Sequence, residues 1–120
     1  MSTIDRFELI EQCSKNYVLA VNDTLNVISG KWKLPIIASL FDGEKRFKEL
    51  EDAIDKISPR MLSKEVKELE LNGIVNRNVH NTTPVLIEYE LTESGHNLQS
   101  VIDAMVQWGL THRQAVINYD

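Results

Sequence analysis

The sequence predicts a mainly helical fold with one small β-hairpin, in a single domain over residues 1–120. Apolar residues recur every three or four positions near both ends and through the middle, which is typical of helices packed on one face. Ser58-Pro59 is a clear helix start. Residues 85–91 mostly alternate between apolar and polar side chains, as a half-exposed strand does. The 120 residues, 42% of them hydrophobic, suffice for one core without disulfides.

The first third of the chain is predicted to form three helices. The N-terminal helix, residues 1–18, carries an apolar stripe made of Ile4, Phe7, Ile10, Cys13 and Tyr17. A separate short helix is expected over residues 21–28, before a Ser-Gly break. A third helix begins near Trp32 or Lys33 and has Pro35 in its first turn, where proline is tolerated. It is expected to end at Asp42-Gly43, with glycine as the left-handed cap.

Residues 46–72 are predicted to form two helices joined by a tight turn. The first covers residues 46–54, and the second runs from the Ser58 cap to residue 72, where Gly73 stops it. At about 100° per residue, the second helix has an apolar face and, nearly opposite, a basic face. The apolar face holds Leu62, Val66 and Leu69, and the basic face holds Arg60, Lys64 and Lys67, bordered by Ser63. One face therefore packs on the core, and the other is presented to a partner.

The last third is predicted to form the hairpin and a long helix. Strands are expected over residues 74–80 and 85–91, joined by the turn-rich segment 81–84, and Thr92 caps the final helix. Along that helix, apolar residues spaced 3, 4 and 3 resemble a heptad seam: Leu98, Val101, Met105 and Trp108. A helix with apolar residues on two sides can cover its own core and also a partner's. Residues 92–120 are therefore predicted to be a C-terminal dimerisation helix, matching an N-terminal one over residues 1–18.

The charge distribution separates a basic middle from acidic ends. The net charge is −5, yet residues 31–80 hold ten of the thirteen basic residues and nine of the eighteen acidic ones. The chain has no glycine-rich phosphate loop, no metal-ligand spacing and no nucleophile elbow, so we expect no enzyme, cofactor or metal site. It also has no secretion signal and no apolar run of about 20 residues, so we expect a cytoplasmic protein without a membrane segment.

Two helices joined by a tight turn, followed by a hairpin, are the order of a winged helix-turn-helix domain, here residues 19–91. A major groove admits one helix, whose exposed side must offer hydrogen-bond donors. The predicted DNA contacts from the two helices and the wing are Lys48, Ser58, Pro59, Arg60, Ser63, Lys64, Lys67, Arg77, His80, Asn81 and Thr82. The alternatives are a solvated basic face and an interaction module that binds protein, which the acidic net charge and Glu65, Glu68 and Glu70 on the same helix favour.

The chain resembles the HxlR-type family of winged-helix transcriptional regulators, relatives of the MarR group. The matching strings occur in order at residues 28–34, 46–50, 57–63, 67–70, 73–77, 88–95 and 108–109. The resemblance implies a homodimer joined by its terminal helices, which binds a two-fold symmetric operator, and we expect a repressor. The expected interface residues are Ile4, Phe7, Ile10, Leu98, Val101, Met105 and Trp108. Some members of the family sense oxidants or electrophiles, so an effector of that kind, or a small molecule, is a candidate partner.

The chain departs from the family pattern at its cysteine and in its wing. The family's sensing cysteine corresponds to Leu19, whereas the only cysteine is Cys13, which we expect to pack in a helix, with a redox role as the alternative. The wing's usual arginine is replaced by Leu86. His80, His96 and His112 lie on different predicted elements, so no metal site is expected from them. Trp32 and Trp108 are predicted to be core residues or, alternatively, the lining of an effector cavity, and Lys31 and Lys33 candidate phosphate contacts.

Overall fold

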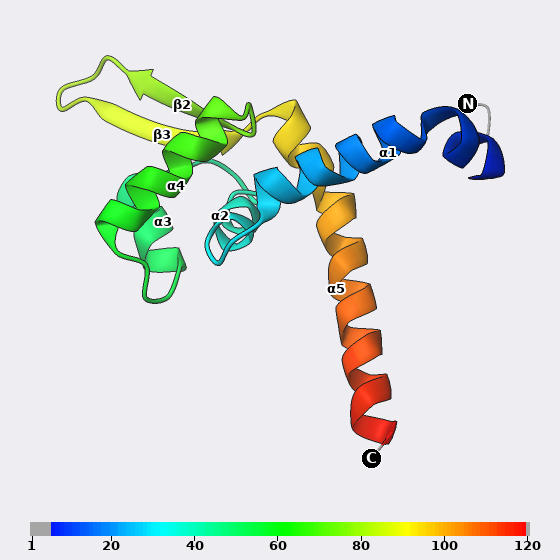
Figure 1. The fold of residues 1–120 in the computed structure, drawn as a ribbon. Coiled ribbons are helices and arrows are strands. Elements are labelled where there is room, and N and C mark those ends of the chain that lie inside the picture. Colours follow the sequence, from blue (N-terminus) through cyan, green and yellow to red (C-terminus); the bar gives the residue numbers. More distant parts are fainter. Residues whose placement is uncertain (1–5, 120) are drawn as a thin grey trace.

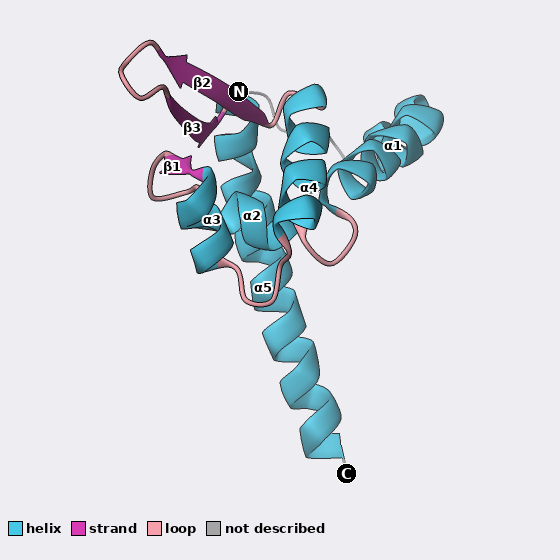
Figure 2. Cartoon of the chain, turned by 90° about the vertical axis from the view of Figure 1, so that its left-hand side faces the viewer, coloured by secondary structure: helices cyan, strands magenta, loops and turns pink. Residues whose placement is uncertain are grey.

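The computed structural model describes residues 6–119, with side chains described for residues 15–117. The elements in chain order are α1 (Arg6–Ile28), α2 (Lys33–Ser39), β1 (Lys45–Arg46), α3 (Phe47–Ala53), α4 (Pro59–Leu71), β2 (Val75–His80), β3 (Leu86–Leu91) and α5 (Glu93–Tyr119). Helices α2, α3 and α4 form the centre of the molecule, from which α1, α5 and the β2–β3 hairpin project in three directions (Figures 1 and 2). The mainly helical fold with a hairpin is therefore confirmed.

The core lies where α2, α3 and α4 meet the base of the hairpin. Its largest fully buried side chains are Ile36, Ile37, Leu40, Leu50, Leu62, Leu69 and Val75. Ile28, at the end of α1, and Leu91, at the end of β3, complete the same cluster. Burying one such side chain contributes about 1.5–3 kcal/mol, so the core fixes α4 through the apolar face that the sequence predicts.

The sheet has three antiparallel strands in the order β1-β3-β2. Strand β3 pairs with β2 from Val75↔Leu91 to His80↔Leu86, and with β1 at Lys45↔Tyr89 and Arg46↔Glu88. The sequence predicts only the hairpin, because β1 is two charged residues long and exists through its pairing with β3. Side chains alternate between the two faces of a sheet. One face meets α4, and the other is polar.

Two predicted helix boundaries are wrong. Helix α1 is continuous from Arg6 to Ile28, with no break before residue 21. No glycine or proline interrupts residues 18–28, and the Thr24 hydroxyl donates to the Ala20 carbonyl at 2.9 Å instead of capping a new helix. Helix α2 ends at Ser39, before Asp42-Gly43, because Leu40 N–H bonds to the Ile37 carbonyl and the chain tightens into a turn.

Three predicted helix starts are confirmed. Trp32 precedes the first residue of α2. The Ser58 hydroxyl accepts a hydrogen bond from Met61 N–H at 3.1 Å, and Pro59 is the first residue of α4. The Thr92 hydroxyl accepts from Gly95 N–H at 3.0 Å and donates to the Gly73 carbonyl at 2.7 Å. Thr92 therefore caps α5 and also ties it to the C-terminal end of α4.

Gly95 sits where α5 crosses the start of the hairpin. A Cβ atom at this position would lie too close to the Ile74 carbonyl oxygen and would also contact Leu91. Its absence lets α5 pack on the base of the sheet. Leu98 and Ile102 also pack against the core, and after them α5 extends away from it. None of the helices over residues 6–119 is both long and apolar enough to cross a bilayer.

Candidate nucleic-acid interface

Helix α4 presents one uninterrupted exposed face. Leu62, Val66 and Leu69 are buried against the core, so the opposite side of the helix is exposed. Arg60, Ser63, Lys64 and Lys67 are all exposed, as the helical spacing predicts, and Ser58 and Pro59 are exposed at the N-terminal end. The side of α4 away from the core therefore carries three cations and a hydroxyl over about two turns of helix.

The basic residues of this face form no ion pairs within the part of the chain whose side chains the structure describes. Among the residues whose side chains are described, Arg60, Lys64 and Lys67 of α4 and Arg77 of β2 form no ion pair. Arginine and lysine side chains that are exposed and unpaired can exchange counterions for phosphate groups at little desolvation cost. This surface is therefore electrostatically suited to a polyanion.

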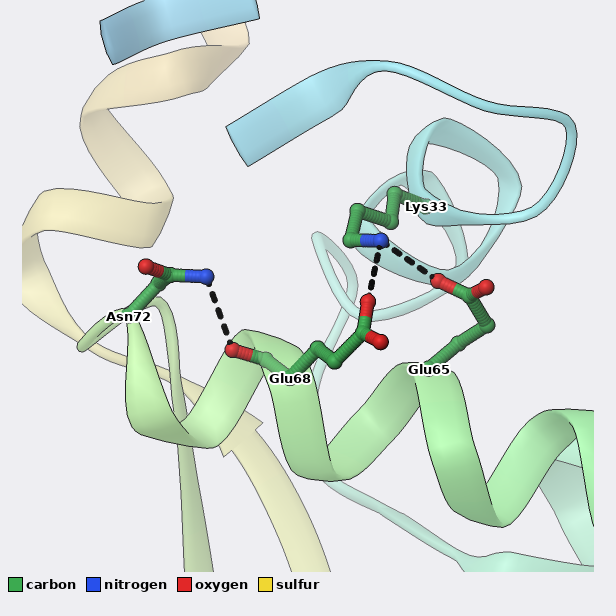
Figure 3. A network of polar contacts seen from close by, with 4 residues as sticks. All are labelled: Lys33, Glu65, Glu68 and Asn72. Atoms are coloured by element: carbon green, nitrogen blue, oxygen red, sulfur yellow. Dashed lines mark hydrogen bonds and ion pairs between the residues drawn. The ribbon is translucent and has the colours of Figure 1, made fainter. Parts of the chain in front are cut away.

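An ion-pair network holds two acidic residues of α4 away from the exposed face of that helix (Figure 3). Lys33 Nζ, on α2, lies 2.7 Å from Glu65 Oε2 and 2.6 Å from Glu68 Oε2, both on α4. The side chains of Lys33 and Glu65 each keep only 12% of their surface exposed. The prediction that Lys33 contacts phosphate is wrong, because Lys33 is paired with Glu65 and Glu68 inside the protein.

The network also shifts the pKa values of Lys33 and Glu68. Burial alone lowers the pKa of Lys33, but hydrogen bonds and charge attraction from Glu65 and Glu68 outweigh it, so the pKa is raised above 10.5. The hydrogen bond from Lys33 lowers the pKa of Glu68, with charge attraction from Lys33 acting the same way. Asn72 Nδ2 donates to the backbone carbonyl of Glu68 at 3.0 Å and closes the last turn of α4 (Figure 3). The network therefore joins α2 to α4 and holds the orientation of α4.

Lys48 is the predicted contact on α3. Its ammonium lies 3.2 Å from Glu51 Oε1 and 3.4 Å from Asp52 Oδ1, on the same helix. Hydrogen bonds to these carboxylates raise the pKa of Lys48. Because the Lys48 side chain is 76% exposed, these pairs are weak and a phosphate group can compete for it.

A cleft of about 330 Å³ separates α4 from the hairpin. Its lining residues are Ser63, Val66, Lys67, Glu70, Arg77 and Tyr89. The cleft brings together two cations from elements that are adjacent in space, one from the helix and one from β2. Two cations, Lys67 and Arg77, face one carboxylate, Glu70, in this lining, so the cleft is suited to one phosphate group of a nucleic-acid backbone.

The wing places the remaining predicted residues at the far end of the hairpin. Asn81 and Thr82 are exposed in the connecting loop, where the Thr82 hydroxyl donates to the Pro84 carbonyl at 2.7 Å. His80 ends β2, and its Nε2 lies 3.1 Å from Glu88 Oε1. The sequence pattern gives no sign that Glu44, His80 and Glu88 gather at one point, because their proximity depends on β1, which the pattern does not predict.

Some predicted residues lie outside the described part of the chain. Ile4 precedes the first described residue. Phe7, Ile10 and Cys13 fall within α1, but their side chains are not among those that the structure describes. The expectations about a dimer interface at the start of α1 and about a thiol sensor therefore stay predictions.

These elements define a winged helix-turn-helix protein, with α4 as the exposed second helix, α3 as the helix before it and the three-stranded sheet as the wing. The comparison with family models agrees, because the model described as HxlR-like helix-turn-helix matches residues 27–116. The chain belongs to this family. It is accordingly a transcriptional regulator with a helix-turn-helix DNA-binding domain.

Individual relatives give the same result. The uncharacterised HTH-type transcriptional regulator YtcD of Bacillus subtilis is 42% identical over 98 residues, which cover 82% of this chain and 78% of that protein. A crystal structure of a regulator assigned to the MarR family from Enterococcus faecalis V583 superposes with a TM-score of 0.78 at 33% identity, over 98% of this chain and 97% of that one. The quinone-bound form of YodB from Bacillus subtilis superposes with a TM-score of 0.69 at 36% identity, over 78% and 98% of the two chains. The family and these relatives are regulators, not enzymes.

Proposed function

We propose that the protein is a repressor that binds an inverted-repeat operator as a homodimer. The observation that carries the proposal is the exposed face of α4, where Arg60, Lys64 and Lys67 have no ion-pair partner among the described residues. In this proposal α4 enters the major groove, Arg60 forks onto a guanine, and Ser63 and Lys64 read adjacent base edges. Lys67 and Arg77 hold a phosphate group at the cleft between α4 and the hairpin.

The remaining predicted contacts surround this centre. Ser58 and Pro59 lie at the N-terminus of α4, where backbone N–H groups favour a phosphate group. Lys48 approaches the backbone from α3, and His80, Asn81 and Thr82 approach it from the wing. Such backbone contacts position the domain, while the α4 side chains supply the sequence preference.

The protein-interaction alternative loses one of its supports in this structure. It depends on acidic residues beside the basic stripe, but Glu65 and Glu68 are both paired with Lys33. Of the three acidic residues on α4 that favour a protein partner, Glu70 alone lacks an ion pair among the described residues, and it lies in the cleft beside Lys67 and Arg77. The net field of the exposed α4 face is therefore positive.

Dimerisation is supported by apolar side chains on the two projecting helices. Val101, Met105 and Trp108 on α5 are 39%, 43% and 68% exposed, although they carry the heptad-like spacing of an interface. Leu98, the fourth residue of that seam, packs against the protein's own core. Helix α1 adds exposed apolar residues at Tyr17, Val18, Leu19, Val21 and Leu25. The prediction that Trp108 is a core residue is wrong within one chain, since its indole ring has no core around it.

A second copy of the chain is the occupant that would bury these faces. Two copies related by a two-fold axis would present their α4 helices to successive major grooves, about 34 Å apart. A Trp108→Glu variant should dissociate in sedimentation velocity and lose operator affinity, because it places a charge in the apolar seam. Gln99→Glu, on the exposed surface of the same helix, is the matched control and should stay dimeric. A monomeric parent protein would refute the proposed interface.

An effector is the last part of the proposal. YodB has been solved with a quinone bound, so a small molecule or electrophile is a reasonable class of ligand for this chain. Three residues of the proposed seam, Val101, Met105 and Trp108, together with Ala104 line an open apolar hollow of about 570 Å³ on α5. A ligand at this position would change how two copies pack and so the spacing of their α4 helices.

Selection from a random duplex pool, at two salt concentrations, tests the proposed function. An enriched inverted repeat is expected, with a log–log salt dependence of slope about −5 to −7 for six to eight phosphate contacts per dimer. A pool without enrichment and with only weak, salt-dependent binding would contradict operator recognition by the free protein.

A further inference from the structure

Three metal-ligating side chains meet on the polar face of the sheet. Glu44 precedes β1, His80 ends β2 and Glu88 lies in β3, the central strand. One ligand atom from each residue lies within 4.8 Å of the other two. Three segments that are separate in sequence thus bring an imidazole nitrogen and two carboxylates to one point on the wing.

The strand register explains the convergence. Asn78 and Arg46 lie opposite Glu88, and His80 is two residues beyond Asn78 on the same strand. Because side chains alternate, His80 and Glu88 share one face of the sheet. Arg77 and Tyr89, which line the cleft beside α4, belong to the other face. The three-ligand cluster therefore lies on the opposite face of the sheet from the proposed phosphate contact of Lys67 and Arg77, and only His80 is also one of the proposed wing contacts.

The two carboxylates of the cluster have no strong cation within the described part of the chain. Lys45, next to Glu44, pairs with Asp42 at 2.6 Å, and Arg46 forms no ion pair with Glu88 among the described residues. The side chain of Glu88 is nevertheless only 19% exposed. Partial removal of a carboxylate from water is unfavourable unless a cation or several donors compensate it. Among the residues whose side chains are described, only His80 pairs with Glu88, and an added cation would satisfy both carboxylates.

We propose that Glu44, His80 and Glu88 bind one divalent transition-metal ion, for which Zn²⁺ is the best probe. Zinc accepts histidine nitrogen together with carboxylate oxygen, and sites with three protein ligands leave a fourth position for water. Mg²⁺ prefers an all-oxygen octahedral shell, so an imidazole ligand selects against it. The bound ion would join the turn before β1 to both strands of the hairpin and would neutralise the two carboxylates.

Competition with a chromophoric chelator, using the full chain without an affinity tag, tests the site. One Zn²⁺ per chain is expected, with Mg²⁺ failing to displace it. His80→Gln and Glu44→Gln should each weaken Zn²⁺ binding at least about tenfold, as loss of a ligand or its support does in other sites. Both positions are exposed, so the variants should keep the parent's circular dichroism spectrum and melting temperature in the absence of metal.

His96→Gln is the matched control, because His96 is exposed on α5 and lies outside the cluster. It should bind Zn²⁺ as the parent does. Absence of binding at equimolar concentrations would overturn the proposal. So would unchanged binding by His80→Gln and Glu44→Gln, which would place the ion at another donor such as Cys13.

A consequence for DNA binding rests on the proposed function. Loop residues 81–85 continue directly from His80, so the ion would remove negative charge next to the segment proposed to reach the DNA backbone. Zn²⁺ should tighten operator binding several-fold in the parent and not in Glu44→Gln. Equal affinity with and without Zn²⁺ would overturn this consequence. Failure to bind any operator would refute the proposed function, while the chelator titration decides the metal site independently.

Discussion

The Lys33 network makes a specific prediction about stability. Lys33→Met keeps most of the aliphatic side chain and removes the ammonium that lies between Glu65 and Glu68. Glu65 is then left with 12% of its side chain exposed and without its hydrogen-bonded cation. The variant should therefore be destabilised mainly by the uncompensated charge of Glu65, and much less by lost packing.

The magnitude follows from the burial of the pair. Breaking a fully buried ion pair costs about 3–5 kcal/mol. The Lys33–Glu65 pair keeps a small solvent contact, so we expect a loss of about 2–3 kcal/mol in the free energy of unfolding at neutral pH. With a urea m-value of about 1.5–2 kcal/mol/M, the midpoint should fall by roughly 1–2 M. All variants must be compared at one chain concentration, because dimerisation adds a concentration-dependent term.

The double variant Lys33→Met/Glu65→Leu is the control. Replacing both partners by apolar residues removes the unpaired carboxylate and should recover most of the lost stability, because apolar replacement of a buried pair is often neutral or better. A coupling energy of about 1–3 kcal/mol is expected from the double-mutant cycle. A single variant within about 0.5 kcal/mol of the parent, the range of ordinary surface changes, would refute the reasoning.

The pH dependence gives an independent check with a definite sign. In the parent, the lowered pKa of Glu68 contributes stability above the carboxyl's unfolded pKa, and this is lost as pH falls through the folded value. The raised pKa of Lys33 contributes stability below 10.5, which is lost as pH rises above its folded value. Lys33→Met removes the cation that lowers the pKa of Glu68, so the variant lacks this contribution to stability. The deficit relative to the parent should therefore be largest at neutral pH and shrink towards pH 4, as measured by urea unfolding.

Three further predictions concern other parts of the molecule. Arg60→Ala should relax sequence preference at one base position by about 1–3 kcal/mol. Lys67→Ala should weaken binding to all duplexes about equally and reduce the slope of the salt dependence by about 1. If Arg60→Ala bound the best operator as tightly as the parent does, the base contact would be excluded. Gly95→Ala should lose about 1–3 kcal/mol of stability through the clash with the Ile74 carbonyl, in spite of alanine's higher helix propensity. Gly109→Ala, where an added Cβ meets nothing within 4 Å, should be neutral or stabilising in the same urea titration. Cys13→Ser and the parent should bind the operator equally before and after mild oxidation, since the cysteine lies six residues before the family's sensing position; loss of binding by the oxidised parent alone would show that the thiol is a sensor.

Local signals made much of the fold predictable from the sequence. Ser58 and Thr92 each supply a hydroxyl that caps a helix, and both form the expected hydrogen bond. The 3.6-residue period of α4 separates Leu62, Val66 and Leu69 from Arg60, Lys64 and Lys67, as the burial of the structure confirms. Such features depend on residues within one or two turns of each other, so the pattern contains the information they need.

The parts that the pattern missed depend on contacts between distant segments. Strand β1 has two residues and forms only where β3 offers its edge. Lys33 is 32 and 35 positions from the two carboxylates that it binds, and nothing in the spacing marks that pairing. Glu44, His80 and Glu88 gather only after both strand pairings have formed. Tertiary contact decides these features, and local propensity carries no signal of them.

The Lys33 network also reconciles an acidic chain with a DNA-binding surface. The net charge of −5 is unfavourable for nucleic acid only if the acidic groups face it. Glu65 and Glu68 lie on α4 itself, but Lys33 holds both of them on the α2 side of that helix. Because Lys33 is used in these pairs, it cannot contact phosphate groups itself. The exposed face of α4 stays positive because a lysine of α2 binds the two carboxylates. A charge count along the sequence sets Glu65 and Glu68 against the exposed face of α4, whereas the structure pairs both of them with Lys33 on the α2 side of the helix.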